Sequence, residues 1–430
     1  MKIRLINRYI LISLIGLFIA FPGFGEPLAR NAILMIGDGM GASHLLLYHL
    51  YAERVLKIEP AFVEMLNEGT TGWMLHAPTD GLVTDSAASA TAFSCGVKAF
   101  NGHISIDADG NSCPTLLEIA KRNGKKTGIV ANIPPFDATE SAFTSHISSR
   151  YDYDAVIRWT FVFTQPDLIL GSAFEKRQEE INAQAQQNGY YIANSLQDMK
   201  NHRESPKLYG VFDIRTPYRD WLAATERDYI SLSEATRGAL DILSQEKKGF
   251  FLMVEGAKID KVSHPNDAGS VLREVEEFDK TIAAVFDFAK THPDTLVIVT
   301  ADHETGGLAI NGGNEESLQI LGRQTKPLLQ IKEELGAQPT PQQVQQAFHD
   351  SVGVDLEPKD TEFLALHWKK PEEVWGDILA RFHKISFVSN EHTAEPVILA
   401  GYGPGSERCN GWRDNTDVFR IIMDACGMGR

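Results

Sequence analysis

Cysteine is scarce in this sequence. Only four occur among 430 residues, and none of them forms a C-x-x-C pair. This excludes a zinc ribbon and a thioredoxin-type redox site as the basis of function. In an oxidising compartment such cysteines are free to form disulfides without being required to, and Cys409 with Cys426 is the first pairing that we would test.

Basic residues are also under-represented. The sequence has 41 Lys and Arg residues and 57 Asp and Glu residues, which gives a formal net charge of -16. Removal of the N-terminal residues Lys2, Arg4 and Arg8 would take this charge to -19. Because nucleic acids need a positive protein surface, the composition argues against nucleic acid as a specific partner. An anionic ligand would have to be attracted by local positive charge.

The chain lacks an apolar run long enough to span a bilayer. The N-terminal run Tyr9 to Phe21 has 13 residues, follows basic residues and precedes small residues at Gly23 and Gly25. These features predict a secretory signal peptide over residues 1–25, and therefore export to the periplasm or the medium. An uncleaved anchor is the alternative interpretation. No cysteine near the boundary suggests a lipid anchor, so we expect no stable membrane anchor.

The remaining sequence predicts an α/β fold. Hydrophobic residues make up 43% of the chain, enough for a large core. Amphipathic helical stretches separate apolar, β-branched runs, an alternation typical of a mostly parallel sheet covered by helices on both faces. We therefore predict a three-layer sandwich. The four runs expected to form central strands are Ala32 to Ile36, Thr127 to Ala131, Phe250 to Val254 and Thr295 to Thr300.

The amino-acid composition changes between residues 311 and 390, where Gln, Glu and Lys become frequent. Within this segment Thr340, Pro341 and Gln343 form a helix-start pattern with a capping box and a proline in the first turn. Strand character returns at Pro396 to Ala400. We therefore predict a helical insertion at about 311–390 within a single domain that spans residues 26–430.

Acidic residues follow three of the predicted strands. Asp38 follows the first strand, Glu255 the third, and Asp302 with His303 the fourth. The carboxyl ends of parallel strands meet at one edge of a sheet, where ligands bind. Each residue alone is more typical of a turn or a helix cap. Together they predict a metal cluster, because converging carboxylates repel one another unless cations hold them.

Further residues offer metal ligands. Asp260 and His264 are four apart, which places two side chains on one face of a helical turn, and His392 precedes a predicted strand. His264 could equally be a surface residue and His392 a structural one. A mixture of imidazole and carboxylate suits zinc, whereas an all-oxygen set such as Asp38, Glu255 and a hydroxyl suits magnesium.

Ser86 and Arg150 are candidates for the reaction itself. Ser86 follows Asp85 at the start of a segment rich in Ala and Ser. One interpretation is a helix cap whose small neighbours allow close packing. The other is a nucleophile at the positive end of a helix. Arg150 could grip two phosphate oxygens or be an ordinary surface charge.

Six motifs in this order resemble those of the alkaline phosphatase family. They are ILMIGDGMG, VTDSAASATAFSCGVK, FDATESAFTSHISSR, FLMVEGAKIDKVSHPND, VIVTADHETGG and HTAEPV. The resemblance covers nearly the whole chain after the predicted signal peptide and weakens only over about 311–390. Six motifs in register are highly specific, although no single one would be.

The resemblance implies a site with two zinc ions and one magnesium ion. The implied ligands are Asp260, His264 and His392 for one zinc, Asp38, Asp302 and His303 for the other, and Asp38, Thr139 and Glu255 for magnesium. It further implies that Ser86 is transiently phosphorylated and that Arg150 binds phosphate. Asp137 and Lys261 match two positions that vary in the family. Vertebrate members have histidines there, and some bacterial members pair Asp with Lys, as here.

The implied activity is hydrolysis of small-molecule phosphate monoesters through a phosphoserine intermediate. A homodimer is the implied assembly, because the family is commonly dimeric. One rival is a related hydrolase of phosphodiesters or sulfate esters, although the C-x-P-x-R and S-x-P-x-R motifs of sulfatases are absent. A second rival is a secreted metal or phosphate scavenger, which the presence of both Ser86 and Arg150 disfavours.

Overall fold

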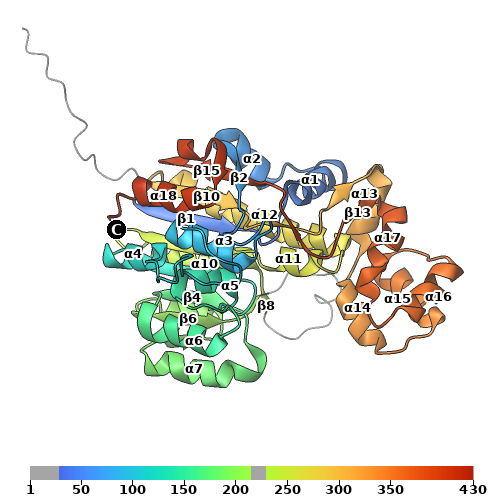
Figure 1. Ribbon diagram of the computed structural model, residues 1–430, viewed down its shortest axis with the longest axis horizontal. Helices are drawn as coiled ribbons and strands as arrows, with labels where there is room; N and C mark the ends of the chain where they lie inside the picture. Colours follow the sequence, from blue (N-terminus) through green and yellow to red (C-terminus); the bar gives the residue numbers. More distant parts are fainter. Residues whose placement is uncertain (1–28, 215–228, 430) are drawn as a thin grey trace, which may run out of the picture.

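A ten-stranded sheet runs through the middle of the molecule (Figure 1) in a computed structural model that describes residues 29–214 and 229–429. The predicted signal peptide, residues 1–25, lies outside the described residues. In spatial order the strands are β16 (Gly411–Asp414), β2 (Thr70–Leu75), β15 (Val397–Tyr402), β10 (Thr295–Thr300), β1 (Asn31–Ile36), β9 (Phe250–Glu255), β3 (Lys126–Ala131), β4 (Leu168–Gly171), β6 (Leu208–Val211) and β5 (Tyr191–Ala193). Within this sheet only β15 runs antiparallel to its neighbours, so the prediction of a mostly parallel sheet is confirmed.

The four predicted central strands are β1, β3, β9 and β10, each within one residue of its expected bounds. Every residue of β1, β9 and β10 is buried, which explains their continuous apolar sequences: both faces are covered. The fifth predicted strand is β15, which begins one residue later than expected and extends to Tyr402. Nothing in the sequence indicated that β15 runs antiparallel to its neighbours.

Helices cover both faces of the sheet and complete the predicted three layers. Helices α1 (Ala42–Tyr51), α2 (Ala61–Glu68), α10 (Leu232–Leu243) and α12 (Ala268–Thr291) pack together on one face. Helices α3 (Ser86–Cys95), α4 (Leu116–Arg122), α5 (Ala138–Thr144) and α18 (Thr416–Ala425) pack together on the other. Shorter helices follow at the β4 to β5 end, namely α6 (Tyr153–Arg158), α7 (Gln178–Gln187) and α8 (Leu196–Asn201).

The segment 311–390 contains its own group of helices. They are α13 (Glu315–Arg323), α14 (Leu328–Leu335), α15 (Pro341–Val352), α16 (Pro358–Leu366) and α17 (Trp375–His383). Figure 1 shows α14, α15 and α16 at one end of the molecule, away from the sheet. Phe348 and Trp375 belong to an apolar cluster separate from the main core. The helix start at Thr340 is confirmed, since its side chain accepts a hydrogen bond from the Gln343 amide.

Helix α3 is buried along its whole length, although its residues are mostly Ala and Ser. It contacts α5 and α18, so small side chains are needed for the close approach. Asp85 is its N-cap, and Asp85 Oδ1 accepts a hydrogen bond of 2.9 Å from the Ala88 amide. The capping interpretation of this segment is therefore confirmed for Asp85, and it leaves the Ser86 hydroxyl available for another role.

Cys409 and Cys426, the pairing that we would test first, are not joined in this structure, in which all four cysteines are free thiols. The two side chains have different surroundings. A Cβ atom on Gly401 of β15 would lie 2.6 Å from Cys409 Sγ, whereas the Cys426 thiol is influenced by the charge of Lys125. Burial raises the pKa of Cys409 to about 12 and that of Cys426 to about 11. Both behave as small buried apolar residues.

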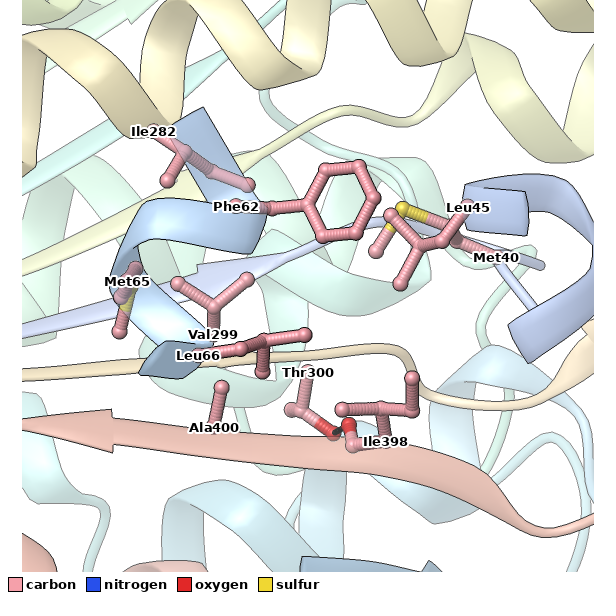
Figure 2. Close-up of a pocket in the computed structure, with 10 residues that line it drawn as sticks. All are labelled: Met40, Leu45, Phe62, Met65, Leu66, Ile282, Val299, Thr300, Ile398 and Ala400. Atoms are coloured by element: carbon pink, nitrogen blue, oxygen red, sulfur yellow. Dashed lines mark hydrogen bonds between the residues drawn. The ribbon is translucent and has the colours of Figure 1, made fainter. Parts of the chain in front are cut away.

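A small apolar cavity of about 20 Å³ lies between α2 and strands β10 and β15 (Figure 2). Phe62, Met65 and Val299 are among the side chains that line it. The hydroxyl of Thr300, its one polar side chain, donates to the Ile398 carbonyl at 2.9 Å. A buried water needs two to four polar partners, so this cavity is a packing gap and not a ligand site.

Candidate active site

The carboxyl ends of three neighbouring strands place the predicted acidic residues together. Strand β1 pairs with both β9 and β10, and Ile36 is in register with Glu255 on one side and Thr300 on the other. Asp38 and Asp302 follow their strands by two residues, and Glu255 is the last residue of its own. All three are buried, and they lie at one edge of the sheet, as their positions after the predicted strands indicated.

Gly39 allows the chain to turn tightly beside Asp38. It has a φ of 72°, and its amide donates to Asp302 Oδ1 at 3.1 Å. A Cβ atom at this position would lie 2.7 Å from Thr305 Oγ1 and 3.0 Å from the Asp260 Cα atom. Both the backbone conformation and the close approach therefore require glycine.

Asp38, Asp302 and His303 form the first group of potential metal ligands. Their ligand atoms all lie within 4.8 Å of one another. His303 Nε2 is 3.1 Å from Asp302 Oδ2 and 3.5 Å from Asp38 Oδ1. Neither of these buried oxygens has a hydrogen-bond partner among the described residues. Buried carboxylate oxygens without donors are costly, so this donor set fits a bound cation.

Asp260 and three imidazoles form an adjoining group. Asp260 lies on α11 (Lys258–Ser263), and its Oδ1 is 3.3 Å from Nε2 of His264, one turn later as the spacing predicted. His392 lies on the short strand β14 (His392–Thr393), with its ring centroid 3.6 Å from that of His303. The ligand atoms of Asp260, His303 and His392 lie within 4.8 Å of one another. His303 therefore adjoins both groups.

Backbone carbonyls fix the orientation of two of these histidines. His264 Nδ1 donates to the Asn390 carbonyl at 2.6 Å, and His392 Nδ1 donates to the Thr84 carbonyl at 2.9 Å. Because a carbonyl only accepts, both Nδ1 atoms carry a proton, which leaves Nε2 as the nitrogen of each ring that a metal ion could take. This tautomer is the one that suits metal ligation through Nε2. Sequence reasoning missed both partners, since any residue type can supply a carbonyl.

Glu304 positions His392, a role that the sequence did not reveal. Strand β14 pairs with β11 (Glu304–Thr305), so Thr305 is in register with His392. Glu304 Oε2 accepts from the Thr393 hydroxyl at 2.5 Å and from the Gly307 amide at 3.0 Å. The carboxylate therefore fixes the two ends of this small sheet beside the histidine.

A third, all-oxygen cluster lies at the carboxyl end of β9. Glu255 forms a hydrogen bond with the Thr139 side chain from α5, and Glu255 Oε2 has no partner among the described residues. The carboxyl group of Glu140 also contacts Glu255. The combination of hydroxyl and carboxylate oxygens is that preferred by hard cations such as Mg²⁺. Glu140 was not among the predicted residues, because a Glu in a first helical turn is typical of a capping box.

The electrostatics of the site differ from one carboxylate to the next. Burial and then the charges of Asp302, Asp260 and Glu255 raise the pKa of Asp38 well above its usual value. Burial and the neighbouring Glu140 likewise raise the pKa of Glu255. The pKa of Asp260 is lowered, because the hydrogen bond from His264 and the nearby positive charges outweigh burial. The cluster thus holds more negative charge than the protein itself neutralises.

Ser86 is the first residue of α3 and points toward the first group of ligands. Its Oγ lies 3.4 Å from His303 Nε2, and the residue is 4% exposed. This position exposes the hydroxyl to the unpaired amides at the start of a buried helix. The geometry is therefore compatible with the predicted nucleophile.

Arg150 is held in place by two carboxylates, one of which belongs to Asp85, the residue before Ser86. One terminal nitrogen is 3.2 Å from Asp85 Oδ2, and the other is 3.0 Å from Asp137 Oδ1. Lys261 Nζ lies 3.3 Å from the second oxygen of Asp137. Asp137 consequently has a lowered pKa despite its burial, mainly through Lys261 and Arg150. The structure thus brings together the predicted site residues, with the Arg150 guanidinium paired to Asp85, the residue before Ser86.

Comparison with known proteins identifies the family. The sequence profile described as alkaline phosphatase matches residues 29–167 and 164–428. The chain belongs to the alkaline phosphatase family. It is accordingly a hydrolase of phosphate monoesters, and the metal-ligand groups described above are in keeping with this assignment.

Individual relatives are similar over most of their length. The chain is 32% identical to alkaline phosphatase 4 of Bacillus subtilis, over 93% of this chain and 89% of that protein. It is 30% identical to alkaline phosphatase of Escherichia coli, over 93% and 86% respectively. The crystal structure of Thermus thermophilus alkaline phosphatase superimposes with a TM-score of 0.86 at 28% identity, covering 95% of this chain and 93% of that one. This family fold confirms the predicted fold class.

Proposed function

We propose that this alkaline phosphatase hydrolyses phosphate monoesters through a phosphoserine intermediate on Ser86, at a site for two zinc ions and one magnesium ion. The observation that carries the proposal is the position of Ser86 Oγ, 3.4 Å from His303 Nε2 and at the start of a buried helix. Two buried carboxylate oxygens without donors, Asp38 Oδ1 and Asp302 Oδ2, lie beside the same His303 nitrogen. Arg150 is paired with Asp85, the residue before Ser86 in the chain.

The proposed metal ligands are the sets that the resemblance to the family implies, and the donor types at these positions suit them. Asp260, His264 and His392 would hold one zinc ion, and Asp38, Asp302 and His303 the other. Asp38, Thr139 and Glu255 would hold magnesium. Bound at these places, the ions supply the positive charge that lowers the pKa of a hydroxyl and stabilises a departing oxygen.

The protein's own residues account for the remaining steps. Arg150 offers a planar pair of donors for two phosphate oxygens, and Asp85 and Asp137 hold it in place. Ser86 Oγ gives its proton to solvent and bonds to phosphorus as the ester P–O bond breaks, and the departing oxygen takes a proton from solvent and leaves as the alcohol. A water molecule then attacks phosphorus, the Ser86 P–O bond breaks, and inorganic phosphate leaves with the Ser86 hydroxyl restored. Asp137 and Lys261 set the charge beside the phosphate.

The variant Ser86→Ala tests this proposal. We expect no labelled phosphoenzyme after acid quench with a radiolabelled aryl phosphate, while the zinc content by elemental analysis stays near that of the wild type. The matched control is Ser94→Ala, which removes a buried hydroxyl from the same helix, where it donates to the Thr91 carbonyl. Full activity of Ser86→Ala would contradict the proposal. Preferential hydrolysis of diesters by the wild type would favour the rival activity.

We also propose export, on the strength of the predicted signal peptide over residues 1–25. In the part of the chain that the structure describes, no helix combines the length and hydrophobicity needed to cross a membrane. N-terminal sequencing of protein recovered from the periplasm or the medium tests this proposal. A mature chain that begins near Glu26 is expected, and retention of Lys2 in exported protein would contradict it.

A homodimer is the assembly that we propose, through an exposed apolar patch on Trp73, Leu75 and Trp412. Trp73 and Trp412 are register partners on β2 and the edge strand β16, and are 42% and 64% exposed. Exposed aromatic residues grouped in this way are typical of protein interfaces. Trp412→Glu should halve the mass measured by light scattering. Leu366→Glu, at an exposed position in α16, is the control and should leave it unchanged. A monomeric wild type would contradict the proposal.

A further inference from the structure

Glu140 is a buried acid beside the all-oxygen cluster at the end of β9. It lies in the first turn of α5, is 0% exposed, and neither of its carboxylate oxygens has a hydrogen-bond partner among the described residues. Desolvating a carboxylate without donors is strongly unfavourable. The residue therefore needs a ligand or a shared proton to be tolerated at this position.

The ordinary explanation for a Glu at this place in a helix does not apply. In a capping box, the third helical residue reaches back to the backbone amide of the N-cap residue. Helix α5 has Asp137 as its N-cap, and the Asp137 side chain accepts from the Ala138 amide at 2.8 Å. Glu140 makes no return bond to the N-cap. It is instead directed inward, toward the sheet edge.

The neighbours of the Glu140 side chain at the sheet edge are other acidic residues. Its carboxyl group contacts that of Glu255 and lies within electrostatic range of Asp38 and Asp137. Glu255 and Asp38 each keep one oxygen without a hydrogen-bond partner in the described chain. Glu140 thus adds a further carboxylate to the cluster that already contains the Thr139 hydroxyl.

We propose that Glu140 is an additional ligand of the third metal ion, alongside Asp38, Thr139 and Glu255. The inference rests on the metal content proposed above and extends it to a residue outside the predicted ligand set. Three carboxylates and a hydroxyl form an all-oxygen site, which favours a hard divalent cation such as Mg²⁺ or Mn²⁺. The two sites that contain histidine retain the preference for zinc.

The test compares the isosteric variant Glu140→Gln with the wild-type holoenzyme. Protein loaded with zinc is titrated with Mg²⁺ in equilibrium dialysis, and both metals are measured by elemental analysis. We expect Glu140→Gln to bind Mg²⁺ about 10- to 100-fold more weakly while it retains two zinc ions. The control is Glu277→Gln. Glu277 is similarly buried, 3% exposed, but accepts from the Ser233 amide at 3.0 Å outside the site. Its Mg²⁺ affinity should match that of the wild type.

Thermal unfolding gives a second readout, independent of activity. Glu140→Gln removes one of several like charges, so the metal-free variant should melt at a higher temperature than the metal-free wild type, and added Mg²⁺ should raise its Tm less. A purely structural Glu140 predicts the reverse, a lower metal-free Tm. Unchanged Mg²⁺ affinity, a metal-free variant that is less stable or does not fold, or a wild type that binds no third ion would each overturn the inference. Failure of the proposed function would show separately, as wild-type protein without zinc or without a labelled Ser86.

Discussion

The sheet edge around Asp38 and the helical segment 311–390 are stabilised in opposite ways. At the sheet edge, buried carboxylates approach one another, and several of their oxygens have no donor among the described residues. In the helical segment, Phe348, Trp375 and their neighbours form an apolar cluster, and the charged residues are paired at or near its surface, as Arg381 is with Asp360. The first arrangement is favourable only when a cation is bound, and the second needs no ligand.

This contrast separates residues retained for chemistry from residues retained for packing. Burying an apolar side chain contributes about 25 cal/mol per Å² of buried area, whereas burying a carboxylate without a partner costs several kcal/mol. A cluster such as Asp38, Glu255 and Glu140 therefore destabilises the metal-free protein. The predictions below are designed to separate the two regions by this difference.

Removal of metal should have the largest effect, and it should act on the sheet edge. Exhaustive chelation is expected to abolish hydrolysis of an aryl phosphate and to lower stability by about 4 kcal/mol for each ion that is present at a thousand times its dissociation constant. Hydrogen exchange should reveal increased opening near Asp302 and little change around Phe348. Full activity in protein shown by elemental analysis to be metal-free would contradict this prediction.

Phe348→Ala should destabilise the helical segment 311–390 and leave the sheet edge around Asp38 unchanged. The side chain is fully buried in the apolar cluster of the helical segment, and its loss should cost about 3 to 5 kcal/mol of local stability. Urea denaturation followed by hydrogen exchange measures this change. Because α15 lies away from the sheet edge, zinc content and kcat/KM at low temperature should match the wild type. Loss of zinc from this variant would show that the two regions are coupled.

His383 should make the helical segment sensitive to acid. It is buried, its Nδ1 accepts from the Ile385 amide, and burial, aided by the charge of Lys384, lowers its pKa to about 4. In the unfolded chain His383 has an ordinary pKa near 6.5, so it binds a proton at pH values where the folded chain keeps it neutral. The free energy of unfolding that is present above about pH 6.5 is therefore lost as the pH falls toward 4. Between pH 7 and 5 the wild type should lose about 2 kcal/mol more than His383→Asn. Equal losses in urea denaturation would contradict this assignment.

Arg150→Ala should have a smaller and more local effect. The removal of two charge-assisted hydrogen bonds should weaken inhibition by inorganic phosphate about 10- to 100-fold, with the zinc content unchanged. Arg158→Ala, at an exposed position on α6, is the matched control and should leave the inhibition constant as it is. Unaltered phosphate inhibition in Arg150→Ala would exclude the predicted role.

Much of this arrangement was predictable because buried parallel strands have distinctive sequences. The residues that follow β1, β9 and β10 are constrained to one edge, so the amino-acid sequence alone places Asp38, Glu255 and Asp302 together. The roles of the individual site residues, by contrast, depended on a resemblance between motifs.

The features that escaped prediction share a physical cause. The carbonyls of Thr84 and Asn390, which orient two histidines, leave no trace in residue type. Glu140 has the sequence signature of a helix cap and a different contact in space. The direction of β15 and the free state of Cys409 depend on long-range packing, which local patterns do not encode.

The most direct test of the central claim is anomalous diffraction at the zinc edge from crystals grown with zinc and magnesium. The account predicts two zinc peaks roughly 4 Å apart, one beside His264 and His392 and the other beside His303 and Ser86. A single ion elsewhere on the molecule, or three imidazoles without any anomalous density between them, would contradict it.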